Sequence, residues 1–398
     1  MLVPEGPRPA AGSGRFPYLP ALDGIRGLLV FPVLAFHFSV TSATGGRAPF
    51  LVAPGSFFAP SMFFTLSGFL ITSLLLLERD RNDGVSWRGF WDRRFRRLVP
   101  GSVTVILVGA ALPLLWKKGA WGALRPQDAF AALTSVKNWQ DIAYASSRNQ
   151  GLRTLGPLSP YWSLSIEEQF YLGMSLLIGL AMFTRRWTVT LTALFATAAA
   201  LSVTALVGIH STPNRELFGT DVRASELLAG CLLALAVRHW GWPTSRWWSV
   251  LGWAALALTA LAWGFVTEHD AWVLNGGLAL TSLLNIAMIL GAATRGSSFA
   301  AVFRFRPLVE IGKLSYTLYL VHWPVALALR PEHTGFSGWP LAAVRVVVSG
   351  AIAWLVTTYV EQPIRTRKVL KGRRFYATWA SVAAISVGAA SLAVHLVG

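Results

Sequence analysis

Long apolar runs recur from near residue 22 to the end of the chain, and this recurrence limits the fold more than any other feature. Crossing the hydrocarbon core of a bilayer takes about 20 helical residues, and many of these runs reach that length. Hydrophobic residues make up 54% of the chain and charged residues 13%. We therefore predict an all-α, polytopic integral-membrane bundle of about ten to eleven transmembrane helices. The expected spans lie near residues 22–40, 57–77, 99–116, 163–183, 187–209, 223–238, 247–266, 272–293, 314–330, 341–360 and 376–397.

The net charge of +17 is carried largely by alternate loops. In a soluble protein this excess could indicate nucleic-acid binding, but here its position along the chain matters more. Five loops hold the basic clusters, at residues 79–97, 185–186, 238–246, 295–306 and 365–374. If the eleven helices alternate in direction, all five loops lie on the same side of the membrane. Because positively charged loops stay in the cytoplasm, we predict a multi-pass protein of the plasma (inner) membrane with a cytoplasmic N-terminus.

The sequence indicates three parts along the chain. Residues 1–19 are rich in Pro and Gly and predict a disordered cytoplasmic tail. Residues 20–375 predict one membrane domain, and residues 376–398 an additional C-terminal transmembrane helix. Cys231 is the only cysteine, so an intrachain disulfide is excluded and no metal site is expected.

The first span, LDGIRGLLVFPVLAFHF (residues 22–38), carries Arg26 and His37 within an apolar helix. Their spacing returns them to nearly one face, roughly 16 Å apart along the helix axis. An ionisable group in such a segment costs several kcal/mol unless it is paired, which makes it a candidate functional residue. The alternative is that Arg26 reaches a lipid head group and His37 hydrogen-bonds a neighbouring helix.

Two carboxylates enter the fourth span from the outer side in YWSLSIEEQFYL (residues 161–172). Glu167 and Glu168 start at about the depth predicted for His37. A carboxylate beside an imidazole fixes its tautomer and stabilises the imidazolium, as a general base requires. The alternative is a pair of carboxylates facing water at the outer rim, a reading that fits Glu168 better than Glu167.

A basic cluster, RRFRRLVP (residues 93–100), opens the third span at the cytoplasmic face. Arg94 and Arg97 are one helical turn apart and share a face that could grip phosphates. The alternative is a topology determinant in contact with anionic lipid. Because no glycine-rich phosphate-binding loop accompanies the cluster, a nucleotide would have to be held by arginine side chains.

Polar residues interrupt the ninth span in GKLSYTLYLVHWPV (residues 312–325), and they include Ser315. Tyr316, Tyr319 and His322 recur every three positions, so they follow one slowly turning stripe and could face one cavity. The alternative for His322 is an interhelical hydrogen bond. Arg223 enters the sixth span in TDVRASELLAG, where a structural role is the simpler interpretation.

Taken together, these motifs and FFTLSGFLIT (residues 63–72) resemble the acyltransferase-3 family of integral-membrane acyltransferases, in family order from about residue 20 to 363. The resemblance implies a bundle of about ten helices that moves an acyl group, commonly acetyl, from cytoplasmic acyl-CoA to a hydroxyl outside or in the membrane. It assigns Arg26 and His37 to the family's first-helix signature, Arg94 and Arg97 to its R-x-x-R pair, and Glu167 to its W-S-L-x-x-E element. The eleventh helix departs from the ten-helix pattern.

The mechanism expected from both arguments uses His37, oriented by Glu167, as the general base for the acceptor hydroxyl. Arg94 and Arg97 would bind the CoA phosphates, with Arg26 further along the donor path. Further candidates for substrate or oxyanion contacts are Ser315, Tyr316, His322, Glu168 and Arg223.

The predicted partners are acyl-CoA, most simply acetyl-CoA, membrane lipid, and a hydroxyl-bearing carbohydrate, glycolipid or glycosylated metabolite, without nucleic acid. Two alternatives stay open at this point. One is a transporter or flippase for a glycolipid or small solute, in which the same polar residues form a pathway. The other is a membrane sensor that binds CoA or lipid without turnover.

Overall fold

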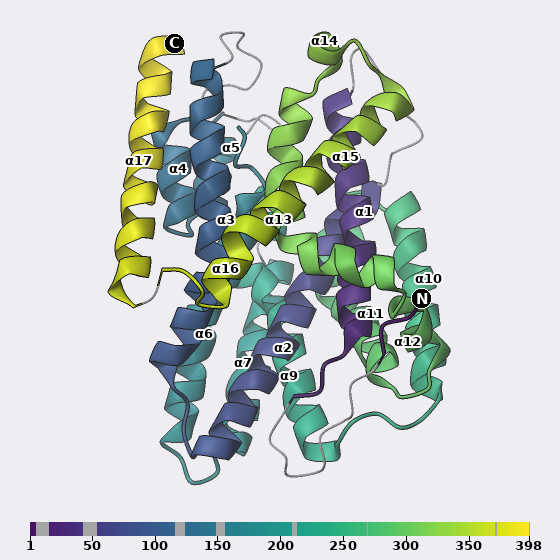
Figure 1. Ribbon diagram of the computed structural model, residues 1–398. Coiled ribbons are helices and arrows are strands. Elements are labelled where there is room, and N and C mark those ends of the chain that lie inside the picture. Colours follow the sequence, from purple (N-terminus) through teal and green to yellow (C-terminus); the bar gives the residue numbers. More distant parts are fainter. Residues whose placement is uncertain are drawn as a thin grey trace. The chain divides into compact units, whose positions relative to one another are not determined.

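A computed structural model describes residues 1–4, 16–42, 54–115, 124–148, 156–208, 213–268, 270–370 and 372–397. Over these residues the chain is helical (Figure 1). Its only extended pairing within the described residues is the isolated bridge between Leu2 and Phe305. The predicted all-α class is confirmed. The long helices are α1 (Pro20–Ser42), α2 (Ala59–Asn82), α3 (Trp87–Leu115), α6 (Tyr161–Met182), α7 (Trp187–Gly208), α9 (Thr220–Trp240), α10 (Trp247–Phe265), α11 (Leu278–Ala293), α13 (Arg306–Ala328), α15 (Gly338–Val356) and α17 (Arg373–Val397).

Short helical segments join these long helices. They are η1 (Pro54–Phe58), α4 (Pro126–Leu133), α5 (Lys137–Arg148), α8 (Pro213–Phe218), η3 (Val273–Gly277), α12 (Ser298–Phe303), α14 (Pro331–Thr334), η4 (Thr357–Glu361) and α16 (Gln362–Arg365). Two of them, η3 and η4, are single π-helical turns.

Within the described residues, seven helical stretches are long and apolar enough to cross a membrane. They lie at Pro20–Ser39, Pro54–Asn82, Trp187–Ala205, Trp247–Phe265, Asn275–Ala293, Gly338–Arg365 and Arg373–Leu392. The remaining predicted spans coincide with α3, α6, α9 and α13, which are helices of the same length class. A multi-pass helical membrane protein is therefore supported, and ten to eleven crossings stay a prediction.

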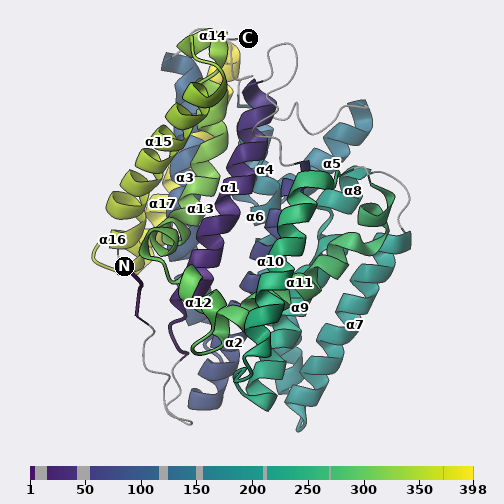
Figure 2. The same cartoon turned by 90° about the vertical axis from the view of Figure 1, so that its right-hand side faces the viewer.

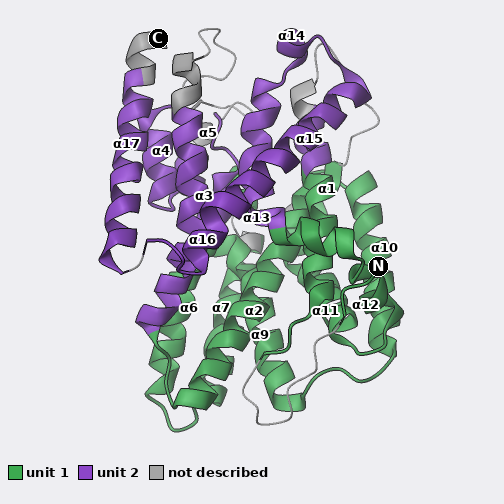
Figure 3. Ribbon diagram, viewed as in Figure 1, with its two compact units in different colours: residues 1–33, 53–86, 166–313 green, residues 34–52, 87–165, 314–398 purple. Residues whose placement is uncertain are grey.

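The chain divides into two compact units, coloured separately in Figure 3. Unit 1 comprises residues 1–33, 53–86 and 166–313, and unit 2 comprises residues 34–52, 87–165 and 314–398. The boundaries fall inside α1, α6 and α13, so each of these helices contributes residues to both units.

Unit 1 is built around α2 and α9, which pack against each other and against α11. Figure 2 shows α7 beside α9, and α10 beside α11, the other close pairs of this unit. Glycines permit the α2–α9 contact, because a Cβ added at Gly230 would overlap the Thr65 carbonyl oxygen and one at Gly68 would overlap that of Leu227. Small residues allow helix backbones to approach closely inside a membrane.

Unit 2 pairs α17 with α3 along their length (Figure 1). Arg96 joins the start of α3 to the chain that leads into α17, because its guanidinium donates to Asp92 at 3.1 Å and to the Leu370 carbonyl at 2.9 Å. The same guanidinium lies 4.3 Å from the ring centroid of Phe375, where a cation–π attraction adds to the contact. The predicted additional helix is therefore part of the packed unit.

Most of the predicted N-terminal tail, residues 5–15, lies outside the described residues. Residues that precede it are hydrogen-bonded to the turn between α12 and α13. Val3 donates its backbone N–H to the Arg304 carbonyl at 2.8 Å, and Arg306 donates to that of Met1 at 3.1 Å.

Gly230→Ala tests the α2–α9 contact. The new methyl group meets backbone atoms of Thr65 and Phe69, which can move away only if the two helices separate. Overpacking of this kind costs about 1–3 kcal/mol, so we expect a lower thermal midpoint in detergent. Gly173→Ala on α6 is the matched control, because a Cβ there meets nothing within 4 Å. Equal midpoints for the two variants would contradict the packing argument.

Candidate active site

Two imidazoles from distant parts of the sequence meet inside unit 2. His37 lies on α1 and His322 on α13, and Nδ1 of His37 is 3.0 Å from Nε2 of His322. The His322 side chain is fully buried. The sequence singled out both residues but predicted no contact between them.

The main chain of α13 determines which nitrogen of each imidazole carries the proton. Nδ1 of His322 lies 2.5 Å from the Tyr319 carbonyl oxygen, which can only accept. His322 Nδ1 is therefore the protonated nitrogen, and its Nε2 accepts the proton of His37 Nδ1. This arrangement places the basic lone pair of a neutral His37 on Nε2. His322 thus orients His37 through this hydrogen bond, and a base that a second group orients is the arrangement that general-base catalysis requires.

Aromatic groups of α13 enclose the imidazole pair. The Trp323 ring lies edge-on to His37 with centroids 5.1 Å apart, and its indole N–H donates to the Gly156 carbonyl at 3.1 Å. Tyr319 donates to the Pro160 carbonyl at 2.9 Å, just before α6 begins, and its hydroxyl lies 2.8 Å from that of Ser163. These bonds hold the Trp323 and Tyr319 rings in place beside the imidazole pair.

The predicted stripe along α13 contacts three different helices rather than one cavity. Tyr316 donates to the Leu98 carbonyl of α3 at 2.6 Å, whereas Tyr319 reaches the start of α6 and His322 reaches α1. Ser315, the remaining candidate of this helix, is buried. The three-residue spacing turns around the helix by about 60° at each step, which is enough to distribute the stripe over successive neighbours.

The predicted phosphate-binding arginines lie on α3 near Tyr316. Arg94 and Arg97 are half-buried, and the Arg94 guanidinium lies 5.8 Å from the Phe90 ring centroid. Glu361 of η4, which the sequence analysis gave no chemical role, accepts from the Thr317 hydroxyl at 2.7 Å. A Cβ at position 101 of α3 would overlap that carboxylate, so Gly101 makes room for it.

Asp92 pairs with Arg96, and this ion pair distinguishes Arg96 from Arg94 and Arg97, the candidate phosphate-binding residues. Burial alone would raise the pKa of Asp92, but hydrogen bonds from Tyr376, Arg96 and Arg367 outweigh it and hold that pKa below its ordinary value. Arg96 is therefore held in a buried ion pair with Asp92, whereas Arg94 and Arg97 are half-buried.

The remaining candidates of the first and fourth spans belong to unit 1. Arg26 forms an ion pair with Asp23 one turn earlier, at 3.3 Å. Glu167 accepts from the Tyr171 hydroxyl at 2.9 Å, and that hydroxyl lies 2.6 Å from Ser67 of α2. Glu168 is half-buried on the same helix. The expected pairing of Glu167 with His37 stays a prediction.

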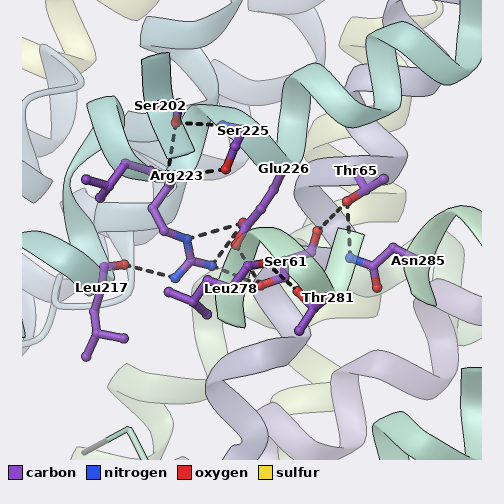
Figure 4. Close-up of polar contacts among 11 residues, drawn as sticks. Ser61, Thr65, Ser202, Leu217, Arg223, Ser225, Glu226, Leu278, Thr281 and Asn285 are labelled. Carbon is purple, nitrogen blue, oxygen red and sulfur yellow. Dashed lines mark hydrogen bonds and ion pairs between the residues drawn. The ribbon is translucent and has the colours of Figure 1, made fainter. Parts of the chain in front are cut away.

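A second polar network lies in unit 1 and includes Arg223, as Figure 4 shows. The Arg223 guanidinium donates to Glu226 at 3.2 Å, to the Leu217 carbonyl at 3.0 Å and to Ser61 at 3.1 Å. Ser61 in turn donates to the other carboxylate oxygen of Glu226 at 3.1 Å. All three side chains are buried, so the network joins α9 to α2 through groups that satisfy one another. The role of Arg223 as a substrate or oxyanion contact stays a prediction.

Arg345 of α15 is a buried cation that the sequence analysis missed. Its guanidinium donates to three backbone carbonyls, of Leu329 and Phe38 at 2.9 Å and of Ala326 at 3.2 Å. The signal in the sequence was a single arginine within an apolar run, without any motif. Among the described residues, no group of three or more His, Cys, Asp and Glu side chains is placed to hold a metal ion.

A buried ion cluster orders the segment predicted to face outward. Lys137 of α5 hydrogen-bonds Asp141 and lies 3.8 Å from Asp128 of α4, which also pairs with Arg125 at 2.9 Å. Burial raises the pKa of Asp141 to about 6, although the Lys137 ammonium opposes the rise. The segment thus carries a carboxylate that titrates in the mildly acidic range.

The architecture and these buried groups define the class of molecule: a multi-pass helical membrane protein with a hydrogen-bonded pair of imidazoles inside its bundle. The chain belongs to the acyltransferase-3 family, since the acyltransferase domain of that family matches residues 19–360. The resemblance predicted from the sequence motifs is therefore confirmed. No solved structure matches the chain.

Several relatives have named activities. The peptidoglycan O-acetyltransferase OatA of Listeria monocytogenes is 31% identical over 379 residues, which cover 87% of this chain and 56% of that protein. The putative peptidoglycan O-acetyltransferase YrhL of Bacillus subtilis is 31% identical, with coverage of 88% and 55%. The O-acetyltransferase OatA of Staphylococcus aureus is 30% identical, with coverage of 88% and 58%. The chain thus spans a little over half the length of these relatives.

We predict that Arg223→Met or Glu226→Leu lowers the thermal midpoint strongly, because each leaves a buried partner uncompensated, at about 3–5 kcal/mol. The double variant Arg223→Met/Glu226→Leu should recover most of this loss. Arg238→Ala is the control, since its pair with Asp80 is exposed and such pairs contribute about 0–1 kcal/mol. Additive losses in the double variant would contradict the mutual dependence of the network.

The raised pKa of Asp141 predicts a pH dependence of stability. Unfolded aspartate ionises near a pKa of about 3.9 and the folded residue near about 6, so between these values the folded state holds the extra proton. Stability relative to Asp141→Asn should therefore fall as pH rises from about 4 to about 6 and stay level above that range. Thermal midpoints across this range measure the difference, with exposed Asp83→Asn as control. A difference that is flat across the range would refute the assignment.

Proposed function

We propose that the protein is a membrane O-acyltransferase that moves an acetyl group from cytoplasmic acetyl-CoA to a hydroxyl of a carbohydrate or glycosylated acceptor. The observation that supports this most is the His37–His322 contact inside the family's domain, because it supplies an oriented base at a fixed place. The relatives whose names state O-acetylation of peptidoglycan support a carbohydrate acceptor.

The imidazole pair moves the proton in this reaction. The acceptor hydroxyl oxygen attacks the thioester carbonyl while Nε2 of His37 takes the hydroxyl proton. The positive charge that forms on His37 is stabilised through its Nδ1–H, which donates to His322 Nε2. Collapse of the tetrahedral intermediate breaks the C–S bond, and the CoA thiolate recovers the proton from His37. Base assistance of this kind contributes about 10²–10⁴-fold.

The α3 arginines would bind the donor. Arg94 and Arg97 lie one turn apart and are half-buried, so their guanidinium groups suit the CoA phosphates. Tyr316 joins α13 to this stretch of α3, and His322 follows six residues later, about 9 Å further along the helix axis. The pantetheine arm of CoA would run along this length of α13, which places the thioester at the imidazole pair.

The acceptor would arrive from the outer side, where the segment 117–162 contains α4 and α5 with their buried ion cluster. The family resemblance implies that Arg26 is a donor-side cation and that Glu167 is an orienting carboxylate. In the mechanism proposed above, His322 takes the orienting role toward His37. The same proposal places the protein in the plasma membrane with its N-terminus in the cytoplasm, because the basic loops then lie inside.

His37→Ala and His322→Leu test the base in liposomes that contain acetyl-CoA and soluble peptidoglycan fragments. Free thiol release that depends on the acceptor should fall by about 10²–10⁴-fold in each variant. His322→Gln should lose less activity than His322→Leu, because a glutamine side-chain oxygen can accept from His37 Nδ1–H.

The control is His239→Ala, since this histidine is exposed at the end of α9 and should leave the rate unchanged. Equal acceptor-dependent thiol release by wild type and His37→Ala would eliminate the proposed base. Counterflow of an unmodified solute without acyl transfer to any acceptor would identify a transporter instead.

A further inference from the structure

The Arg345 guanidinium donates hydrogen bonds to three main-chain carbonyls that lie in, or just after, two other helices. Nη1 binds the carbonyl of Phe38, the residue after His37 on α1. Nη2 binds the carbonyl of Ala326, one turn after His322 on α13, and Nε binds that of Leu329 just beyond the end of the helix. The cation therefore contacts both helices that carry the imidazole pair.

The chemistry of these contacts favours rigidity. The last four carbonyls of a helix have no partner within it, and Ala326 supplies one of those carbonyls on α13. A cation at a helix C-terminus is also favoured by the helix dipole. The planar guanidinium holds its donors in a fixed fork, so the three acceptors are held in a fixed relation to one another.

The Arg345 guanidinium also packs against the aromatic ring of Phe38, which lies next to the imidazole pair. The Arg345 guanidinium lies 5.6 Å from the Phe38 ring centroid, and that ring lies 6.5 Å from the His322 imidazole centroid. Both Arg345 and Phe38 are buried. A change at Arg345 would therefore reach the imidazoles through the backbone of both helices and through this ring.

We propose that Arg345 is the positioning residue of the imidazole pair: by binding the Phe38, Ala326 and Leu329 carbonyls, it holds His37 and His322 at hydrogen-bond distance. Arg345 touches neither imidazole in this role and takes no part in the proton transfer. The inference rests on the proposed function for its effect on turnover, but the geometry that it describes can be measured without turnover.

Arg345→Lys is the principal test, because an ammonium keeps the charge and loses the planar fork. We expect kcat to fall by about 10²-fold, as for a misplacement of about 1 Å, with the KM for acetyl-CoA within about twofold. Ser349→Ala is the matched control, since Ser349 is buried one turn further along α15. Its kcat should equal that of the wild type.

A double-mutant cycle separates positioning from general structural damage. In the His322→Leu background, Arg345→Lys should cause little further loss, because leucine cannot accept from His37 and the contact that Arg345 positions is already absent. A full additional loss in that background would overturn the proposal, as would an unchanged kcat for Arg345→Lys alone. If neither Arg345→Lys nor Arg345→Gln accumulated as folded protein, Arg345 would serve folding alone and the proposal would fail.

Carbethoxylation of histidines by diethyl pyrocarbonate gives a readout that is independent of acyl transfer. Peptide mass spectrometry should show that buried His322 reacts slowly in the wild type and in Ser349→Ala, and faster in Arg345→Lys. Equal reactivity of His322 in all three proteins would overturn the positioning role. Absence of acyl transfer from the wild type to any acceptor would refute the proposed function, whereas this measurement would still decide the role of Arg345.

Discussion

A polar side chain inside an apolar helical bundle has to find its partner within the protein, because lipid offers none. This constraint organises both units of the chain. Arg223 contacts a carboxylate one turn further along its own helix and a hydroxyl on α2. Arg345 contacts three backbone carbonyls, and His322 contacts a carbonyl and a second imidazole. The partners always come from another helix or another turn, so each satisfied group also fixes how two segments pack.

The helices were predictable because hydropathy reports the apolar core of each one. The predicted span 187–209 corresponds to α7 at Trp187–Gly208, and 247–266 to α10 at Trp247–Phe265. The ends differ where a helix continues beyond its apolar part, as in α3, which starts at Trp87 rather than near residue 99. Backbone hydrogen bonding continues through the polar residues 87–98, and hydropathy is insensitive to it. The π-helical turns gave no signal either.

The candidate site was predictable as a set of residues but not as a set of contacts. His37 and His322 are separated by 285 positions, and nothing in either motif indicates that they touch. Arg345 was invisible for a different reason: its acceptors are main-chain carbonyls, which every residue has. A contact between two side chains involves two complementary residue types that can both be read in a sequence. A hydrogen bond from a side chain to the backbone involves only one recognisable residue type. Spacing along α13 predicted a stripe, but its slow rotation brings each member to a different neighbour.

The bond between His322 and the Tyr319 carbonyl limits which substitutions can alter the tautomer of His322. The group that sets the tautomer is an atom of the peptide backbone, so no side-chain replacement at position 319 deletes it. Single substitutions at Tyr319 would measure the contribution of its side chain and would not measure that of its carbonyl. The tautomer of His322 is therefore insensitive to most single substitutions at this position. Replacing the 319–320 amide by an ester, which weakens the carbonyl as an acceptor, would probe it at its source.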